Sequence, residues 1–157
     1  MRKASALVWL LVGVGALASC GAPAMQHQIQ SSFPMTQDFD RTWSAVIETF
    51  ADLNLPISNM EKASGLIVTD WIDYGRDTST MDCGKIGFPF IEVGRRGKFN
   101  VFVKSDGNGG TVMRVSSSFE ITSSYENNVQ RGVCYSTGAL ENRIRELVAG
   151  KLAVASK

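Results

Sequence analysis

Two segments of the chain place apolar residues at the spacing of an amphipathic helix, with polar residues on the opposite face. The first follows the cap candidates Thr36 and Asp38 and ends near residue 54, before Pro56. Its apolar positions are Phe39, Trp43, Val46, Ile47, Phe50 and Leu53. The second begins at Ser136 or Thr137, and its apolar positions are Leu140, Ile144, Leu147, Val148 and Leu152. The outward face of the second helix is expected to hold Glu141, Arg143, Arg145 and Glu146.

Between these helices the pattern changes to the two-residue period of β-strands. "PISNME" and the β-branched "GLIVTDWI" flank the turn "KASG", and "GKFNVFVKS" and "TVMRVSSSFEIT" flank "DGNGG", whose residues tolerate positive φ. Each pair predicts a hairpin, and "IQSSF" predicts a first strand before the first helix. Residues 73–90 and 123–135 show no clear period, so we expect a long excursion and an irregular segment there.

The predicted order of elements is β-α-β-β-β-β-α, which indicates an α+β fold. Strands joined by short turns form an antiparallel sheet, and the apolar stripes of the helices need one face of that sheet to pack on. We therefore expect both helices on one face of a single antiparallel sheet. The length fits one domain over residues 29–157.

The N-terminal residues have the pattern of an export signal. Arg2 and Lys3 precede an uncharged run over residues 6–18, which is shorter than the roughly 20 residues of a membrane-spanning helix. The run ends in "LASC", which is similar to the lipobox of bacterial lipoproteins, where the cysteine thiol receives a diacylglycerol and becomes the new N-terminus. We predict a lipoprotein signal peptide over residues 1–19, lipidation of Cys20, and a lipidated tether over residues 20–28. An ordinary secretory signal with a chance cysteine is the alternative.

Gly21, the residue after the lipidated cysteine, bears on the destination of the protein. In enteric-type sorting an aspartate at this position retains a lipoprotein in the inner membrane. The glycine therefore indicates lipid anchoring in the outer membrane. We separately expect the domain to face the periplasm.

Two further cysteines, Cys83 and Cys134, belong to the exported part of the chain. An even pair in an oxidising compartment predicts a disulfide, and only one pairing is possible. A catalytic or metal-binding thiol is the alternative, but neither cysteine has a histidine near it in sequence.

The chain offers few groups for catalysis. His27 is its only histidine, no glycine-rich phosphate loop joins a strand to a helix, and 16 basic residues nearly balance 15 acidic ones. We therefore predict a non-enzymatic protein without cofactor or metal and without a nucleic-acid partner. The cluster Asp70, Asp73, Asp77 and Asp82 leaves a carboxylate-based glycan hydrolase as an alternative.

Trp71 and Tyr74 are the candidate interaction surface. Regular alternation would place Ile67, Thr69 and Trp71 on one face of their strand, and an exposed aromatic beside a long loop suits a peptide, glycan or protein partner. The alternative is that residues 73–90 fold over Trp71 and bury it.

Four stretches together resemble the BamC (NlpB) family of outer-membrane lipoproteins: "TWSAVIETFADLNLPI", "GLIVTDW", "RRGKFNVFVK" and "YSTGALENRIRELV". The resemblance implies a BamC-like α+β domain in an envelope setting, with a role beside the outer-membrane β-barrel assembly machinery. Enteric-type members carry a long docking segment before two such domains in tandem, and no residue of this chain matches that segment. The expected function is a non-enzymatic interaction module that is held to the membrane by its lipid and binds an envelope protein. The alternative is a binding module for a small envelope ligand, such as a glycan, peptide or lipid.

Overall fold

The computed structural model describes residues 21–154, so the predicted signal peptide and Cys20 lie outside the described residues. Two helices, α1 (Phe39–Asp52) and α2 (Ala139–Val154), accompany an eight-stranded sheet. The strands are β1 (Ser32–Met35), β2 (Ile57–Glu61), β3 (Leu66–Thr69), β4 (Ile72–Gly75), β5 (Met81–Asp82), β6 (Ile91–Ser105), β7 (Thr111–Tyr125) and β8 (Asn128–Ser136).

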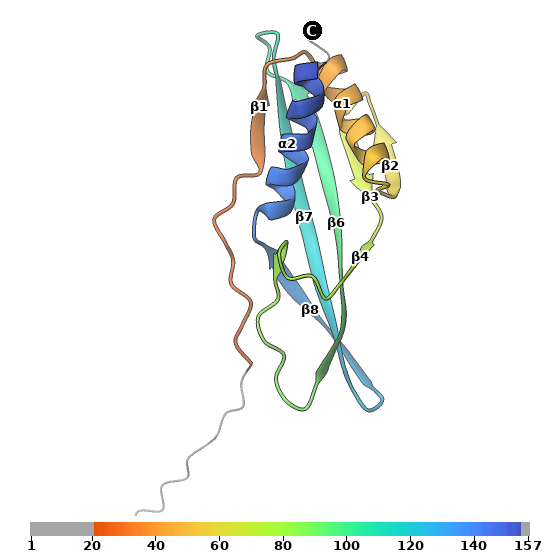
Figure 1. Cartoon of the computed structure of the whole chain (residues 1–157), viewed down its shortest axis with the longest axis vertical. Helices are drawn as coiled ribbons and strands as arrows, with labels where there is room; N and C mark the ends of the chain where they lie inside the picture. Colours follow the sequence, from red (N-terminus) through yellow and green to blue (C-terminus); the bar gives the residue numbers. More distant parts are fainter. Residues whose placement is uncertain (1–20, 155–157) are drawn as a thin grey trace, which may run out of the picture.

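The sheet is antiparallel and has the order β2-β3-β6-β7-β8-β5, with β1 paired to one end of β7 and β4 paired to β6. The long strands β6 and β7 run the length of the molecule, and both helices lie on the same face of the sheet near one end (Figure 1). The predicted α+β class, with both helices packed on one face of an antiparallel sheet, is confirmed.

The core lies between the helices and the inner face of the sheet. Register pairs Val101 with Val115 and Val103 with Met113, and all four side chains are almost completely buried. The ring of Phe50 from α1 contacts Phe99 edge-on at 5.4 Å between centroids. Asp38 caps α1 by accepting a hydrogen bond from the backbone N–H of Arg41 at 2.9 Å. The alternation of buried and exposed side chains along β6 and β7 decides which face of the sheet the helices cover.

The prediction of an irregular segment over residues 123–135 is wrong. Strand β7 continues to Tyr125, and β8 pairs back along it from Asn128 to Cys134. The turn between them uses Glu126 at a φ of 51°. Serine, threonine and glutamine occupy much of this hairpin, so it lacks the apolar alternation that marks a half-buried strand, although its backbone groups pair normally.

The expected excursion over residues 73–90 also contains two short strands. Strand β4 pairs with β6 and places Ile72 and Tyr74 against the core cluster, while β5 pairs with β8. Residues 83–90, between β5 and β6, have no strand or helix. The loop prediction is therefore confirmed only for part of this segment.

Candidate functional site

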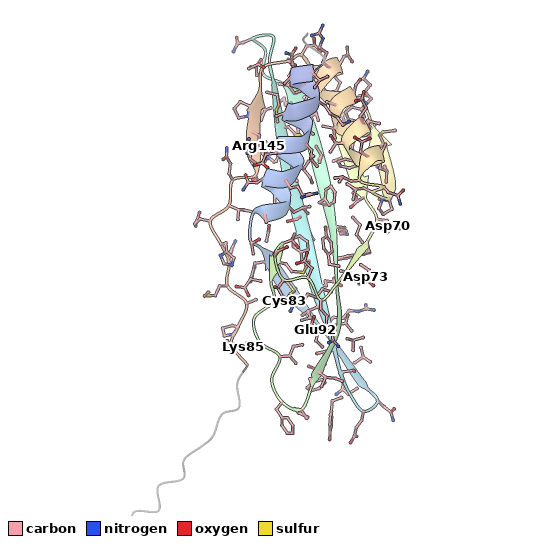
Figure 2. The ribbon with its side chains drawn as sticks, viewed as in Figure 1. Asp70, Asp73, Cys83, Lys85, Glu92 and Arg145 are labelled. Carbon is pink, nitrogen blue, oxygen red and sulfur yellow. A yellow bond between two sulfur atoms is a disulfide. The ribbon has the colours of Figure 1, made fainter. Side chains whose placement is uncertain are left out.

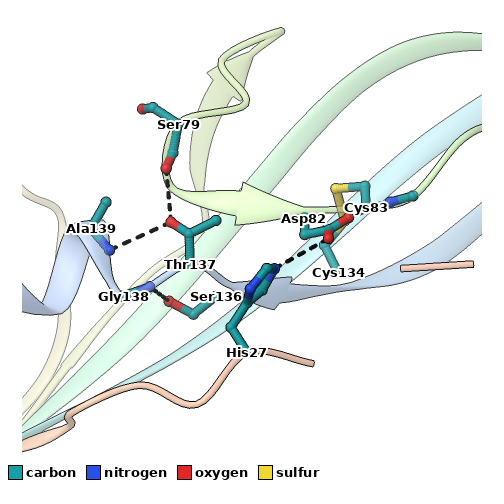
Figure 3. A network of polar contacts seen from close by, with 10 residues as sticks. His27, Ser79, Asp82, Cys83, Cys134, Ser136, Thr137, Gly138 and Ala139 are labelled. Carbon is teal, nitrogen blue, oxygen red and sulfur yellow. Dashed lines mark hydrogen bonds and ion pairs between the residues drawn. A yellow bond between two sulfur atoms is a disulfide. The ribbon is translucent and has the colours of Figure 1, made fainter. Parts of the chain in front are cut away.

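Cys83 and Cys134 form a disulfide, as predicted. Cys83 and Cys134 are joined with a Cα–Cα distance of 4.2 Å, and Cys134 is buried in the core (Figure 3). The bond ties the segment after β5 to strand β8. It leaves neither thiol free, so the catalytic or metal-binding alternative for these cysteines is wrong.

The strand that contains "GLIVTDWI" is interrupted at Asp70 and Trp71, and this break changes which face Trp71 occupies. The carboxylate of Asp70 accepts a hydrogen bond from the Trp71 N–H at 2.7 Å, so the chain turns between β3 and β4. Ile67 and Thr69 point into the core, as their burial shows. The predicted shared face for Ile67, Thr69 and Trp71 is therefore wrong.

Trp71 is half-buried on the face of the sheet that the helices leave uncovered. Its ring lies 4.3 Å from the guanidinium carbon of Arg96 and 5.0 Å from Nζ of Lys98, and these residues alternate along β6 with the buried Phe99. Arg96 also donates to the carboxylate of Glu120 on β7 at 2.7 and 3.0 Å. Cation–π contacts and this ion pair hold the indole in place without burying it in the core.

Tyr74 lies on the opposite face of the sheet from Trp71. Its ring meets Phe119 edge-on at 5.8 Å between centroids, beside Gly97, where any side chain would collide with the Phe119 ring. The two aromatic residues predicted to share an interaction surface are therefore not brought together. Trp71 remains the surface candidate, and Tyr74 belongs to the packing of the inner face.

The surroundings of the Tyr74 side chain raise the pKa of its phenol. Burial raises the pKa of Tyr74 above its usual 10.0, and the negative charges of Glu141 and Asp77 raise it further. We expect one component of the phenolate absorbance titration to appear above the ordinary range and to disappear in Tyr74→Phe. The raised pKa adds stability below pH 10 that is lost as the pH rises above it, because the unfolded chain releases this proton first. A Tyr74→Phe protein that keeps the absorbance component at high pH would contradict the assignment of that component to Tyr74.

An open groove lies along the edge of β7 that faces away from β6, between the end of its pairing with β1 and the start of its pairing with β8. Strand β1 pairs with β7 only as far as Arg114, Ser31 accepts a hydrogen bond from the Val115 N–H at 2.8 Å, and β8 begins to pair at Phe119. Residues 116–118, all serines, belong to neither ladder. The groove encloses about 520 Å³, and its lining includes Trp71, the three serines, Val133 and Tyr135.

Glu141 forms the inner wall of this groove and is completely buried. Its carboxylate accepts hydrogen bonds from the hydroxyls of Ser117 at 2.5 Å and Ser136 at 2.8 Å. Within residues 21–154 no lysine or arginine forms an ion pair with it. The expectation that Glu141 faces outward is wrong. The helical pattern could not reveal this, because the two serine partners come from β7 and from the end of β8.

The four carboxylates proposed for a hydrolase each serve a local turn. The hydrogen bond to Asp70 is described above. The other three carboxylates each accept a hydrogen bond from the backbone N–H two residues later: Asp73 from Gly75 at 2.7 Å, Asp77 from Ser79 at 2.8 Å and Asp82 from Gly84 at 2.8 Å. The hydrogen bond from Ser79 lowers the pKa of Asp77, and that from Gly84 lowers the pKa of Asp82. Lowered values keep a carboxyl group ionised and do not suit a general acid.

Residues 21–154 contain no group of three or more histidine, cysteine or acidic side chains that could hold a metal ion. No helix in this part of the chain is both long and apolar enough to cross a membrane. No family model matches the chain, and no curated protein matches it.

Proposed function

We propose that this protein is a lipoprotein anchored in the outer membrane through Cys20, with a BamC-like domain that acts as a non-enzymatic interaction module in the periplasm. Its partner is an envelope protein, and the module serves as an accessory in envelope or outer-membrane protein assembly. The observation that carries the proposal is the position of Trp71. The indole is fixed by Arg96 and Lys98 on a sheet face without helices, beside the open groove at β7.

This surface has the composition of a binding site for protein. Tryptophan and arginine are enriched among the residues that contribute most to association. Val133 and Tyr135, exposed by 71% and 39%, extend the apolar surface along β8. The serine segment of β7 adds backbone groups outside both strand ladders, which an extended segment of a partner can reach by strand addition.

The test is capture of partners from solubilised membranes by the lipidated protein and by Trp71→Ala. We expect the substitution to weaken binding of the captured partner by roughly 1–3 kcal/mol, measured by titration, because a partly covered aromatic anchor is lost. The fold should remain, with the melting temperature changed by only a few degrees, since Trp71 is outside the core cluster.

Asp73→Asn is the matched control, because Asp73 is exposed and lies two residues along the chain. It should leave capture unchanged. Equal capture of the partner by the wild type and by Trp71→Ala would contradict the proposal that the surface around Trp71 binds the partner. Hydrolysis of a cell-wall or glycan substrate that is lost in Asp70→Asn, Asp73→Asn, Asp77→Asn or Asp82→Asn would overturn the non-enzymatic proposal.

A small envelope ligand is the second candidate, and the groove favours it. Its volume of about 520 Å³ lies within the range of small-molecule sites. The serine hydroxyls and the aromatic rim suit a glycan or a short peptide. Native mass spectrometry of the protein purified from its membrane separates the two candidates, because a bound small molecule adds a small discrete mass and a protein partner adds the mass of a whole polypeptide chain.

A further inference from the structure

Exposed apolar side chains gather at the end of the sheet farthest from the helices. Phe88 is 87% exposed, Ile91 68%, Val93 58% and Val129 63%. Register places Ile91 and Val129 on either side of Ser124, so they are neighbours across β6, β7 and β8. The loop before β6 and the β7–β8 hairpin both end at this end of the molecule (Figure 1). We call these four residues the apolar tip.

The apolar tip is not required by the core. None of its four members belongs to the core cluster or to the side chains packed against it. The side-chain view shows Lys85 and Glu92 at the same end of the molecule (Figure 2). Glu92 is neutralised by two hydrogen bonds from Arg95, at 2.9 and 3.0 Å. A group of exposed apolar side chains at one end of a molecule is typical of a surface that meets a protein or a membrane.

The start of the described chain is held against the base of this tip. The N–H of Lys85 donates to the carbonyl of Ala22 at 2.8 Å, and the His27 ring lies 3.2 Å from the carboxylate of Asp82 (Figure 3). A Cβ on Gly21 would collide with the Lys85 carbonyl and would lie 2.9 Å from the Gly87 nitrogen. The described part of the tether is therefore an extended strap along residues 82–87.

This contact places the start of the strap close to the loop before β6. Cys20, the proposed site of the lipid, directly precedes the strap in sequence. Gly21 lies close enough to Gly87 that a Cβ on Gly21 would be 2.9 Å from the Gly87 nitrogen, and Gly87 directly precedes Phe88. The strap therefore begins close to Phe88 of the apolar tip, so a lipid on the preceding residue would hold the tip near the membrane.

We propose that the apolar tip inserts into the lipid interface of the membrane that holds the anchor. This inference rests on the proposed lipidation of Cys20. Each tip side chain adds apolar burial to that of the acyl chains, and Lys85 can extend to the phosphate groups. Insertion fixes the orientation of the domain. Both helices are directed away from the bilayer, and the sheet face that carries Trp71 is roughly perpendicular to the plane of the bilayer.

The experiment uses the lipidated protein reconstituted into phosphatidylethanolamine–phosphatidylglycerol vesicles with and without brominated acyl chains. Phe88→Trp and, independently, Val129→Trp place a fluorescent residue at the tip. Val154→Trp is the control, because Val154 is 76% exposed at the end of α2, away from the tip. We expect brominated lipid to reduce the added emission at least about twofold at Phe88 and Val129 and to leave that at Val154 unchanged.

Mass spectrometry of the same samples keeps the two proposals apart. Protein that carries a diacylglyceryl group on Cys20 but shows no quenching at either tip position overturns tip insertion and leaves the anchor intact. Protein that carries no lipid on Cys20 overturns the anchor and, with it, this inference. Equal quenching at Val154 would show that the domain lies flat on the membrane, which also contradicts it.

Discussion

Removing the Cys83–Cys134 disulfide lowers the free energy of unfolding by about 4 kcal/mol, on the chain-entropy account of cross-links. The bond joins residues 51 apart in sequence, so it restricts a large part of the unfolded chain. It also ties Cys134, which is only 4% exposed, to the segment after β5. The measurement is urea unfolding of the double variant Cys83→Ala, Cys134→Ala beside the oxidised wild type.

The control for this prediction is reduction of the wild-type protein. A reductant should lower the stability of the wild type toward that of the double variant and leave the variant unchanged. The slope of the unfolding free energy against urea concentration should be smaller for the oxidised wild type, because its unfolded state is more compact. Equal stability of the oxidised wild type and the double variant would show that the bond does not restrict the unfolded chain as proposed.

Glu141→Ala lowers the free energy of unfolding by about 2–4 kcal/mol. The substitution leaves the hydroxyls of Ser117 and Ser136 without their acceptor, and each unpaired polar group costs roughly 1–3 kcal/mol when it is buried. Water from the groove can replace part of the loss, which keeps the value below the sum. Glu141→Gln keeps one acceptor oxygen and should cost about half as much.

Glu146→Ala is the matched control on the same helix. Its side chain is 65% exposed and forms an ion pair with its neighbour Arg145, so its removal should change stability by less than about 0.5 kcal/mol. A double-mutant cycle with Ser117→Ala isolates the contribution of the shorter hydrogen bond. If Glu141→Ala were no more destabilising than Glu146→Ala, the buried carboxylate would have no role in stability.

The sequence predicted the elements whose pattern is repeated over several turns or pleats. The apolar stripe of α1 and the alternation around "DGNGG" each repeat often enough to define a helix and a hairpin. The disulfide followed from the number of cysteines and the predicted export. Strand β8 was missed, because Val129, Val133 and Tyr135 are exposed and the pattern reports burial, not backbone pairing.

The candidate site was less predictable, because its residues meet only in three dimensions. Trp71 was singled out by its type, but its face depends on one turn at Asp70 that reverses the alternation. The partners of Glu141 come from two other elements, and the groove exists because β1 ends before β8 begins to pair. No local pattern contains such a gap between two strands on a shared edge.

If the chain is exported as proposed, the pairing of β1 with β7 sets an order of events during export. The N-terminal strand leaves the translocation channel early, but its partner, from Thr111 to Arg114, follows only after most of the chain has passed. A contact so distant in sequence forms late, because a long loop must close before it. Under the proposed lipidation, the acylating enzymes therefore meet the chain before β1 has paired with β7 and before the strap has taken its place. In this fold, the proposed modification of the N-terminus therefore precedes the pairing that attaches the N-terminal segment to the sheet.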